Sequence, residues 1–485
     1  MGKNNDRSTR REFLGKAGAV ALSLPFVAGL TGASAGAATK RRNIIFILTD
    51  DQRYDAMSCM GHPFLETPNL DRLVSGGVLL KNAFVTTSLC SPSRATILTG
   101  RYAHRTGVTD NSTAFPEGTT TFPMILKEAG YETAFIGKWH MRDLSDYDMP
   151  QPGFDRWVSF PSQGVYFNPR FNIDGEREQK KGYTTDLLTD YAVEFLKRPR
   201  TKPFCLYLAH KAVHASFEPA PRHRDKYADV PVVPPPSMAD TEENYRGRPA
   251  WVRAQRNSWH GVDGMYNRRM SYDQFIRNYN RTVLAIDDSV GRVLDTLKET
   301  GILDSTLVIF TSDNGFLQGE HGLIDKRCMY EESLRVPMLA HCPEIAPAKQ
   351  RVEKMVLNVD IAPTILDAAG VPIPNTMDGS SFLPLLRGEN VPWRQSFLYE
   401  YFWEQMFPQT PTVFGVRTET HKYMWYHGIW DKNEVYDLKD DPHEMTNLID
   451  DPASSALRKE LESELARLMN ELSVSRVPSW SRQSL

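Results

Sequence analysis

The sequence predicts an α/β fold: a large, mixed and mostly parallel sheet sandwiched by helices, followed by a smaller C-terminal antiparallel sheet with one helix. Two observations support this fold class. Continuous apolar runs alternate with helical patterns up to about residue 385, and from residue 386 the segments become short and rich in aromatic residues. At 485 residues, the chain is also too long for one ordinary hydrophobic core and suits a large domain with a smaller one.

Five apolar runs of strand length are the expected strands of the large sheet. Their continuous hydrophobicity requires cover on both faces, as in a parallel sheet flanked by helices. They are Asn43–Leu48, Thr133–Ile136, Phe204–Leu208, Leu307–Phe310 and Val336–Leu339.

Helical patterns lie between these runs. Residues 184–197 form one, Asp273–Thr300 a long one ended by Gly301, and Asp360–Ala369 a third that stops at Gly370. Strands that alternate with helices in this way predict an α/β sandwich.

The C-terminal part, residues 386–485, is expected to be a subdomain distinct from a catalytic domain at residues 36–385. A helix over about residues 455–472 should pack on its antiparallel sheet. The expected strands are Phe397–Tyr401, Val413–Val416, Lys422–Tyr426 and Glu434–Tyr436. Within the first domain, residues 215–272 form an irregular insertion rich in Pro, Trp and Tyr, and long excursions of this kind are usually functional.

Residues 1–35 resemble a twin-arginine export signal. Arg10 and Arg11 precede a weakly apolar stretch, and Ala33-Ser34-Ala35 fits a cleavage site. The sequence therefore predicts export by the Tat machinery to the periplasm or the exterior, the alternative being a disordered basic tail. No stable membrane anchor is expected, because Pro25 and Gly29 interrupt the apolar stretch and no cysteine lies near the cleavage site.

Charge and cysteine usage exclude several classes of protein. The formal net charge is −3 and no long run of one sign occurs, which argues against a nucleic-acid partner. The five cysteines are widely scattered and form neither a disulfide framework nor a zinc motif. On composition alone, each would be a small buried hydrophobic residue.

Acidic residues follow two of the expected strands. Asp50 and Asp51 come after the first strand, and Asp313 with Asn314 after Leu307–Phe310. Active sites of open α/β sheets lie beyond the carboxyl ends of the strands, and hard oxygen ligands suit Ca²⁺ or Mg²⁺ better than zinc. Each pair alone would be a helix cap or turn; together they favour a metal site.

The segment from Leu89 to Arg101 carries the most specific pattern. Composition alone would make it a turn that runs into a helix, with Cys90 buried and inert. The order Cys90-Ser91-Pro92-Ser93-Arg94, continued by Thr99-Gly100-Arg101, resembles the signature of the sulfatase family, in which this cysteine is oxidised to formylglycine. Further segments occur in the family's order over essentially the whole mature chain, and they imply an alkaline-phosphatase-like fold. They include Gly137-Lys138-Trp139-His140, Thr311–Gly315 and Tyr330–Pro337.

The resemblance also implies a role for each matching residue. Asp50, Asp51, Asp313 and Asn314 would hold one Ca²⁺, with the formylglycine from Cys90 completing its shell. Arg94 and Lys138 would hold the formylglycine oxygens and His140 would hydrogen-bond to one of them. His214 and Lys326 would bind the sulfate, and either could protonate the oxygen of the leaving alcohol. His210 is a weaker candidate for substrate binding, one layer of residues further from the sulfate.

This set of residues suits sulfate ester hydrolysis. A sulfate monoester is an anion whose nonbridging oxygens repel a nucleophile, and a divalent cation with two lysines would neutralise that charge. A hydrated aldehyde offers one hydroxyl to attack sulfur and a second to expel sulfate afterwards. The expected partners are therefore a sulfated substrate and a formylglycine-generating maturation enzyme.

Several stretches are most similar to the N-acetylglucosamine-6-sulfatase and mucin-desulfating branch, including Ile324–Arg327 and Met377–Gly379. The preferred substrate is a sulfated polysaccharide or its oligosaccharides. The insertion at residues 215–272 and the 160–172 loop are expected to recognise the sugar. The candidates to stack on a sugar, or simply to pack their loops, are Trp251, Trp259, Tyr266 and Tyr166. Two other functions stay open: a phosphonate or phosphate ester hydrolase on the same scaffold, and a non-catalytic binder of sulfated glycans with unconverted Cys90.

Overall fold

The structure is a computed structural model that describes residues 41–141, 148–428 and 431–474. The predicted export signal lies outside these residues. From Arg41 onward the described chain forms one compact unit. Among the described residues, no helix combines the length and the apolar character needed to cross a bilayer.

The large sheet contains ten described strands, in the order β13-β2-β12-β9-β1-β8-β4-β5-β6-β7. Its centre, from β9 to β5, is parallel, and the strands outside this centre add antiparallel pairs on both sides. The central strands are β1 (Asn43–Thr49), β4 (Glu132–Gly137), β5 (Arg156–Ser159), β8 (Phe204–Ala209) and β9 (Thr306–Ser312). The outer strands are β2 (Val78–Leu80), β6 (Arg170–Ile173), β7 (Glu176–Gln179), β12 (Met338–His341) and β13 (Gln350–Val352).

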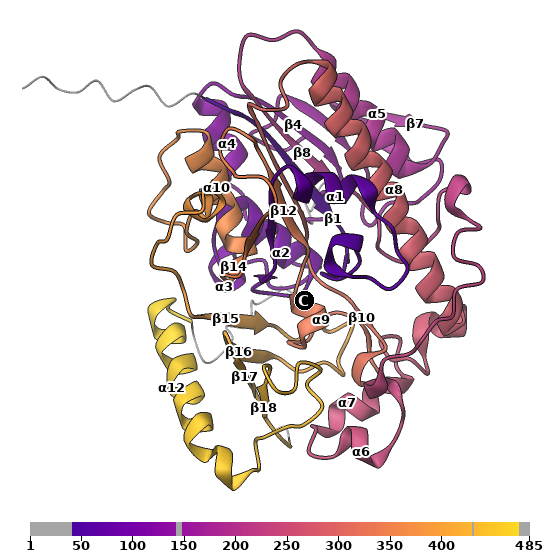
Figure 1. The fold of residues 1–485 in the computed structure, drawn as a ribbon, viewed down its shortest axis with the longest axis vertical. Helices are drawn as coiled ribbons and strands as arrows, with labels where there is room; N and C mark the ends of the chain where they lie inside the picture. The colour runs from indigo at the N-terminus through magenta and orange to yellow at the C-terminus, as the bar shows by residue number, and fades with distance from the viewer. Residues whose placement is uncertain (1–40, 142–147, 429–430, 475–485) are drawn as a thin grey trace, which may run out of the picture. The chain divides into compact units, whose positions relative to one another are not determined.

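Helices cover both faces of this sheet, as the apolar runs predicted (Figure 1). Successive residues of β1 illustrate the arrangement, since Phe46 belongs to one buried cluster and Ile47 to the other. The first cluster includes residues of α2 (Cys90–Thr99), α4 (Phe122–Glu128) and α10 (Ile361–Ala368). The second includes residues of α1 (Pro68–Ser75), α5 (Thr184–Lys197) and α8 (Tyr272–Glu299). The predicted α/β sandwich is therefore confirmed.

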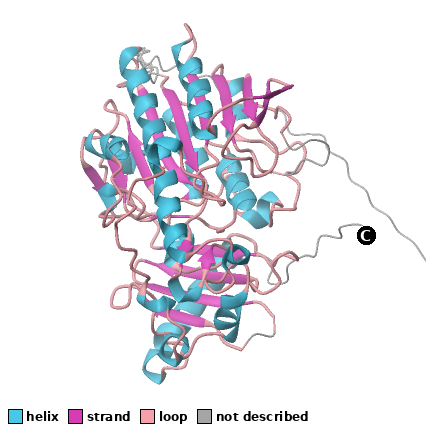
Figure 2. Cartoon of the chain, turned by 90° about the vertical axis from the view of Figure 1, so that its right-hand side faces the viewer, coloured by secondary structure: helices cyan, strands magenta, loops and turns pink. Residues whose placement is uncertain are grey.

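The C-terminal sheet is antiparallel, and its strands run across those of the large sheet in the lower part of Figure 2. It consists of β15 (Ser396–Tyr401), β16 (Val413–Thr418), β17 (His421–Tyr426) and β18 (Glu434–Asp437), with α12 (Ser455–Glu471) packed on it. Its apolar residues join the first buried cluster, and the rings of Phe84 and Phe397 lie 5.2 Å apart. One continuous core thus links the two sheets.

Two features differ from the simplest expectation. The run Val336–Leu339 contributes to β12, which lies antiparallel to β9 because it returns across the edge of the parallel centre. The insertion before α8 contains short helices, among them α6 (Glu242–Tyr245) and α7 (Ala250–Ala254).

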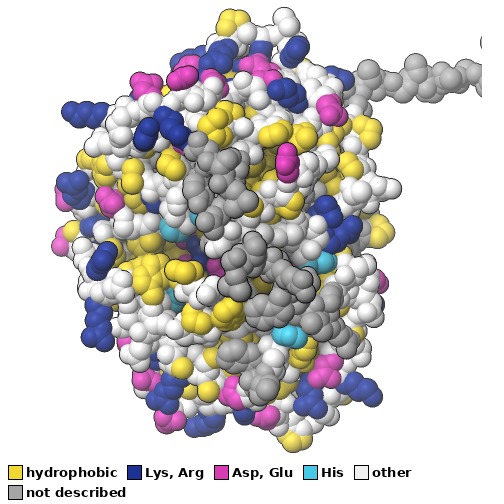
Figure 3. Space-filling view, turned by 180° about the vertical axis from the view of Figure 1, so that it is seen from behind, with side chains coloured by type: hydrophobic (Ala, Val, Ile, Leu, Met, Phe, Trp, Pro, Cys, Tyr) yellow, Lys and Arg dark blue, Asp and Glu magenta, His cyan; other side chains and the backbone are white. Residues whose placement is uncertain are grey.

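On the face shown in Figure 3, acidic and basic side chains are interspersed among small apolar groups.

Candidate active site

The carboxyl ends of β1 and β9 bring the acidic residues together. The two strands are parallel neighbours, with Thr49 in register with Ser312, so Asp50 and Asp313 follow at the same edge. The backbone N–H of Asp51 donates to Oδ1 of Asp313 at 3.2 Å. Carboxylate oxygens of Asp50, Asp51 and Asp313 all lie within 4.8 Å of one another. The predicted metal ligands therefore form one cluster.

The chemistry of this cluster fits a hard divalent cation. All three carboxylates are buried, and burial together with repulsion from Asp50 raises the pKa of Asp51 to about 7. Asn314 donates its amide to Oδ1 of Asp51 at 2.7 Å, and its own Oδ1 is buried with no hydrogen-bond partner among the described residues. An unpaired buried oxygen beside crowded carboxylates is costly unless a cation binds there. Three carboxylates and one amide oxygen suit calcium.

Cys90 begins α2, directly beside this cluster. Its Sγ lies 3.6 Å from Oδ1 of Asp50, and the side chain is fully buried. Burial raises the pKa of the thiol, so an unmodified Cys90 would stay neutral and poorly nucleophilic. Because Cys90 is the first residue of α2, the positive end of the helix dipole lies at the same place.

Arg94 lies one helical turn after Cys90 and ties three elements together. Its Nε donates to Oδ2 of Asp313 at 2.9 Å, and a second guanidinium nitrogen donates to the carbonyl of Lys138 at 2.6 Å. The side chain is buried. Burial opposes the positive charge, but Asp313 and Asp50 outweigh it and raise the pKa of Arg94.

Lys138 and His140 follow β4 and meet a residue that the sequence did not indicate. The ammonium of Lys138 contacts Asp50 and the side-chain oxygen of Gln163, while the amide nitrogen of Gln163 lies 2.9 Å from Nε2 of His140. Burial, and the nearby positive charge of Lys138, lower the pKa of His140. Gln163 belongs to the 160–172 loop, but a lone glutamine in a loop carries no recognisable pattern.

His214 and Lys326 reach the cluster from the Asp51 side. Nε2 of His214 lies 3.7 Å from Oδ2 of Asp51, and its Nδ1 is 3.0 Å from the carbonyl of Ala215. Burial lowers the pKa of His214 well below its ordinary value. Lys326 is buried and its ammonium contacts Asp51. Two cations thus contact different carboxylates of the cluster: Lys138 contacts Asp50, and Lys326 contacts Asp51.

His210 lies apart from the other predicted residues. It is buried against α8, with Nε2 at 3.1 Å from the hydroxyl of Ser289, and burial lowers its pKa to about 3. In the part of the chain that the structure describes, no hydrogen bond or ion pair joins it to Cys90 or to the aspartates. The segment between His210 and His214 is a turn after β8 and not a helix.

Four buried polar residues form a connected group beside Lys326, and we call it the polar ring: Asp325, Arg327, His260 and Glu404. Asp325 joins it to Lys326, since its Oδ1 lies 3.6 Å from Nζ of Lys326. Nε2 of His260 lies 2.8 Å from Asp325, and Arg327 donates to both Asp325 and Glu404 at 2.8 Å. His260 comes from the insertion and Glu404 from the loop between β15 and β16. The stretch Ile324–Arg327, singled out by its sequence similarity, contains Asp325 and Arg327, but the sequence did not indicate His260 or Glu404, which are 144 residues apart in it.

Backbone conformation also singles out this region. Four non-glycine residues of the cluster and the ring have positive φ: Asp51 (63°), His140 (55°), Asp325 (78°) and Arg327 (81°). Such conformations cost energy and cluster at functional sites.

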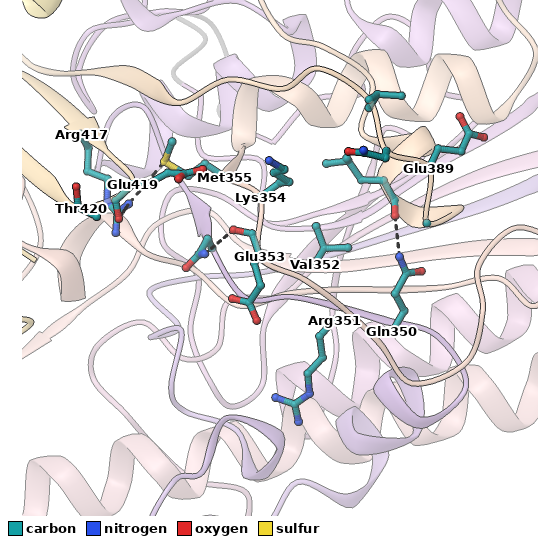
Figure 4. Close-up of a pocket in the computed structure, with 15 residues that line it drawn as sticks. Gln350, Arg351, Val352, Glu353, Lys354, Met355, Glu389, Arg417, Glu419 and Thr420 are labelled. Carbon is teal, nitrogen blue, oxygen red and sulfur yellow. Dashed lines mark hydrogen bonds between the residues drawn. The ribbon is translucent and has the colours of Figure 1, made fainter. Parts of the chain in front are cut away.

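A pocket of about 590 Å³ between β13 and the β16–β17 turn contains none of the predicted site residues. Figure 4 shows Arg417, Glu419 and Thr420 at one end of it and Gln350 with Glu389 at the other.

Comparison with known proteins identifies the family. The sulfatase family model matches residues 42–371, and a model described as the C-terminal part of N-sulphoglucosamine sulphohydrolase matches residues 319–471. The chain is 37% identical to an N-acetylglucosamine-6-O-sulfatase of Bacteroides thetaiotaomicron, over 87% of this chain and 85% of the relative. It is 32% identical to the N-acetylglucosamine-6-sulfatase of Homo sapiens, over 87% of this chain and 83% of the relative.

Solved structures agree with this assignment. One, a protein in complex with its substrate D-glucosamine-2-N,6-O-disulfate, superposes with a TM-score of 0.83 at 33% identity and covers 90% of this chain and 98% of its own. The phosphonate monoester hydrolase of Agrobacterium radiobacter, at 23% identity and a TM-score of 0.77 over 89% of this chain and 96% of its own, shares the fold. The chain therefore belongs to the sulfatase family and is a sulfuric ester hydrolase.

Proposed function

We propose that this sulfatase removes the 6-O-sulfate from N-acetylglucosamine or a related glucosamine in sulfated glycans, using a formylglycine made from Cys90 and one calcium ion. The observation that carries the proposal is the position of Cys90. It begins α2 beside three clustered carboxylates, two of which are contacted by Lys138 and Lys326. The names of the relatives at 37% and 32% identity support the sugar and the sulfate position.

The proposed calcium ligands are Asp50, Asp51, Asp313 and Asn314, together with the modified residue 90. When bound, calcium would offset the negative charge of the sulfate, and the hydrated aldehyde would supply the attacking hydroxyl. Arg94, held by Asp313 and by the Lys138 carbonyl, would keep its guanidinium fixed beside residue 90. A donor that is already fixed needs no reorganisation during the reaction.

The two lysines are the proposed sulfate ligands. Each is buried and contacts a different carboxylate, so both ammonium groups face the cluster. Nonbridging sulfate oxygens between them would meet a positive charge on two sides, which favours in-line attack at sulfur.

His214 is the proposed donor to the leaving alcohol. Its Nδ1 donates to the carbonyl of Ala215, so Nε2 faces the carboxylates and the reacting group. Because Nδ1 already carries a proton, donation from Nε2 requires the imidazolium form of His214, which the negative charge of a bound sulfate ester would favour; this form can transfer its Nε2 proton to the ester oxygen as the S–O bond breaks. Lys326, beside Asp51, is the alternative donor.

The polar ring supports a carbohydrate as the substrate. It lies next to Lys326 and presents carboxylate, guanidinium and imidazole groups, which pair well with sugar hydroxyls. Because these groups are buried and already bonded to one another, they are held in place before a substrate binds.

Two measurements test the proposal. Mass spectrometry of the peptide that spans residues 82–94 should show a loss of about 18 Da when the thiol becomes an aldehyde. Purified enzyme should then hydrolyse N-acetylglucosamine 6-sulfate faster than the 6-phosphate of the same sugar. A faster reaction with the phosphate or a phosphonate ester would favour the esterase function, and an unmodified thiol without turnover would favour a glycan-binding protein.

We also propose that residues 1–35 direct export through the Tat machinery, after a maturation enzyme has acted on Cys90 in the cytoplasm. Replacing both Arg10 and Arg11 with lysine should leave the protein in the cytoplasm, because the Tat machinery recognises the arginine pair. Cell fractionation measures this, and normal export of the double variant would contradict the proposal.

A further inference from the structure

An exposed apolar surface lies just outside the polar ring. We call it the aromatic ledge, and it consists of Trp259, Phe407 and Met406. The guanidinium of Arg327 lies 3.9 Å from the centre of the Phe407 ring, and the His260 ring lies 4.4 Å from it. The rings of Trp259 and Phe407 are 6.3 Å apart. Phe407 of the ledge therefore packs directly on Arg327 and His260, two residues of the polar ring.

Exposure separates Trp259 from the other aromatic candidates. Trp251 is buried against Tyr426, and Tyr166 is buried beneath Lys211. Trp259 is 37% exposed and Met406 is 75% exposed, in two loops that are remote in sequence. Trp259 and Phe407, which follows Met406, come from separate segments, and their rings lie 6.3 Å apart; exposed apolar side chains gathered from separate segments are a feature of binding sites.

Tyr266 connects the ledge with the reaction centre. Its ring contacts that of Trp259 edge-on at 4.7 Å, and its hydroxyl is near enough to Asp325 and Asp51 for their charges, with burial, to raise its pKa. His260, the neighbour of Trp259 in the chain, also lies 2.8 Å from Asp325, whose Oδ1 is 3.6 Å from Nζ of Lys326. A ligand anchored by its sulfate at Lys326 would extend past the polar ring toward the ledge.

We propose that the aromatic ledge binds the sugar residue next to the sulfated one, so that the enzyme prefers an oligosaccharide over a monosaccharide. This inference rests on the proposed function. A pyranose has an apolar face of C–H groups and a polar rim, which match the indole of Trp259 and the polar groups behind Phe407. The continuity of the ledge with the polar ring favours the same glycan chain as the occupant over an unrelated partner.

Steady-state kinetics with two substrates tests the ledge. The probes are N-acetylglucosamine 6-sulfate and a disaccharide that contains this sulfated sugar, and the quantity is the ratio of their kcat/KM values. Trp259→Ala should lower the ratio of disaccharide to monosaccharide about 10-fold, mainly through KM for the disaccharide, as truncation of a contributing tryptophan does at interfaces. Trp259→Phe should retain most of the preference.

Control variants keep this test decisive. Ile373→Ala removes an apolar side chain of similar exposure (41%) on the connection after α10, and it should leave the ratio unchanged. If Trp259→Ala does not fold, Met406→Ser alters the ledge from the other loop and should lower the ratio by a smaller factor. An unchanged ratio in the folded ledge variants would overturn the proposal, and so would a change of oligomeric state without a change of ratio.

Failure of the ledge can be told apart from failure of the proposed function. If the wild-type enzyme hydrolyses an aryl sulfate but neither sugar sulfate, the sugar substrate is wrong and the ledge proposal falls with it. If both sugars are hydrolysed with equal kcat/KM, the substrate class stands and the ledge alone is overturned.

Discussion

The side-chain amide of Gln163 lies 2.9 Å from Nε2 of His140. Because the oxygen of the same amide accepts from Lys138, its nitrogen must donate, and the neutral imidazole of His140 must carry its proton on Nδ1. Gln163 thus orients two residues of the predicted site through a single group.

Replacing Gln163 with glutamate should raise the pKa of His140, because a carboxylate stabilises the imidazolium. The acidic limb of the pH profile of kcat/KM should then move to higher pH, since a larger fraction of His140 is charged near neutrality. Gln163→Ala should lower kcat without this displacement. If both variants give the wild-type profile and rate, Gln163 does not orient His140.

Removal of the proposed calcium should abolish activity and destabilise the protein. Without a cation, Asp50, Asp51 and Asp313 remain buried within 4.8 Å of one another. Chelation should therefore lower the melting temperature, and added calcium should restore it, as expected for a ligand that binds only the folded state. Asp51→Asn should melt at the same temperature with and without chelator. A chelator-resistant, fully active enzyme would contradict the proposal.

Calcium affinity should depend on pH near neutrality. In the metal-free protein the pKa of Asp51 is raised to about 7, so below this pH the carboxyl holds a proton that calcium must displace. Affinity should thus rise as the pH increases through 7. Because of the raised pKa of Asp51, the folded metal-free protein binds more protons than the unfolded chain between about pH 4 and 7. Its free energy of unfolding should therefore decrease as the pH rises from about 4 to 7. Calorimetric titration and urea unfolding measure the two effects.

Arg94 should be far more important than an exposed arginine. Arg94→Ala would leave Asp313 buried without its main partner, at a cost of about 3–5 kcal/mol in the free energy of unfolding. The control is Arg72→Ala, since Arg72 pairs with Asp295 on the surface and should cost less than about 1 kcal/mol. Urea unfolding compares the two variants. Equal costs would show that Arg94 does not hold the cluster together.

His210 and His214 should differ in what they support. His214 faces Asp51 and is the proposed proton donor, so His214→Ala should lower kcat about 10²-fold or more. His210 bonds Ser289 of α8, so His210→Asn should mainly lower the melting temperature and leave kcat within a few-fold. A large loss of kcat in folded His210→Asn would place this residue in the reaction.

The elements with a strong apolar pattern were predictable from the sequence. The helix expected at residues 184–197 is α5, and the runs at Asn43–Leu48 and Leu307–Phe310 are the central strands β1 and β9. Strand β7 was not predicted, because Glu-Arg-Glu-Gln is exposed throughout and has no apolar pattern. The antiparallel direction of β12 was not predicted either, since direction depends on the path of the connecting chain.

The same contrast holds for the site. Acidic residues at strand ends can be predicted, because neighbouring parallel strands must end at the same edge. Gln163, His260 and Glu404 reach the site from loops whose positions depend on tertiary packing, so their local sequence gave no indication. For them only the three-dimensional arrangement is informative.

The proposed reaction centre and the proposed sugar-binding surface are built from different segments of the chain, although one core links the two sheets. The carboxylates, Cys90 and the lysines belong to segments around the large sheet, whereas His260, Trp259, Glu404 and Phe407 belong to an insertion and to a loop of the small sheet. Changes at Trp259 and Phe407 can therefore alter the proposed sugar contacts, whereas His260 and Glu404 also hold Asp325 and Arg327, the neighbours of Lys326. Evolution could redirect such an enzyme to another glycan by exchanging loops, while the machinery that cleaves sulfate is inherited unchanged.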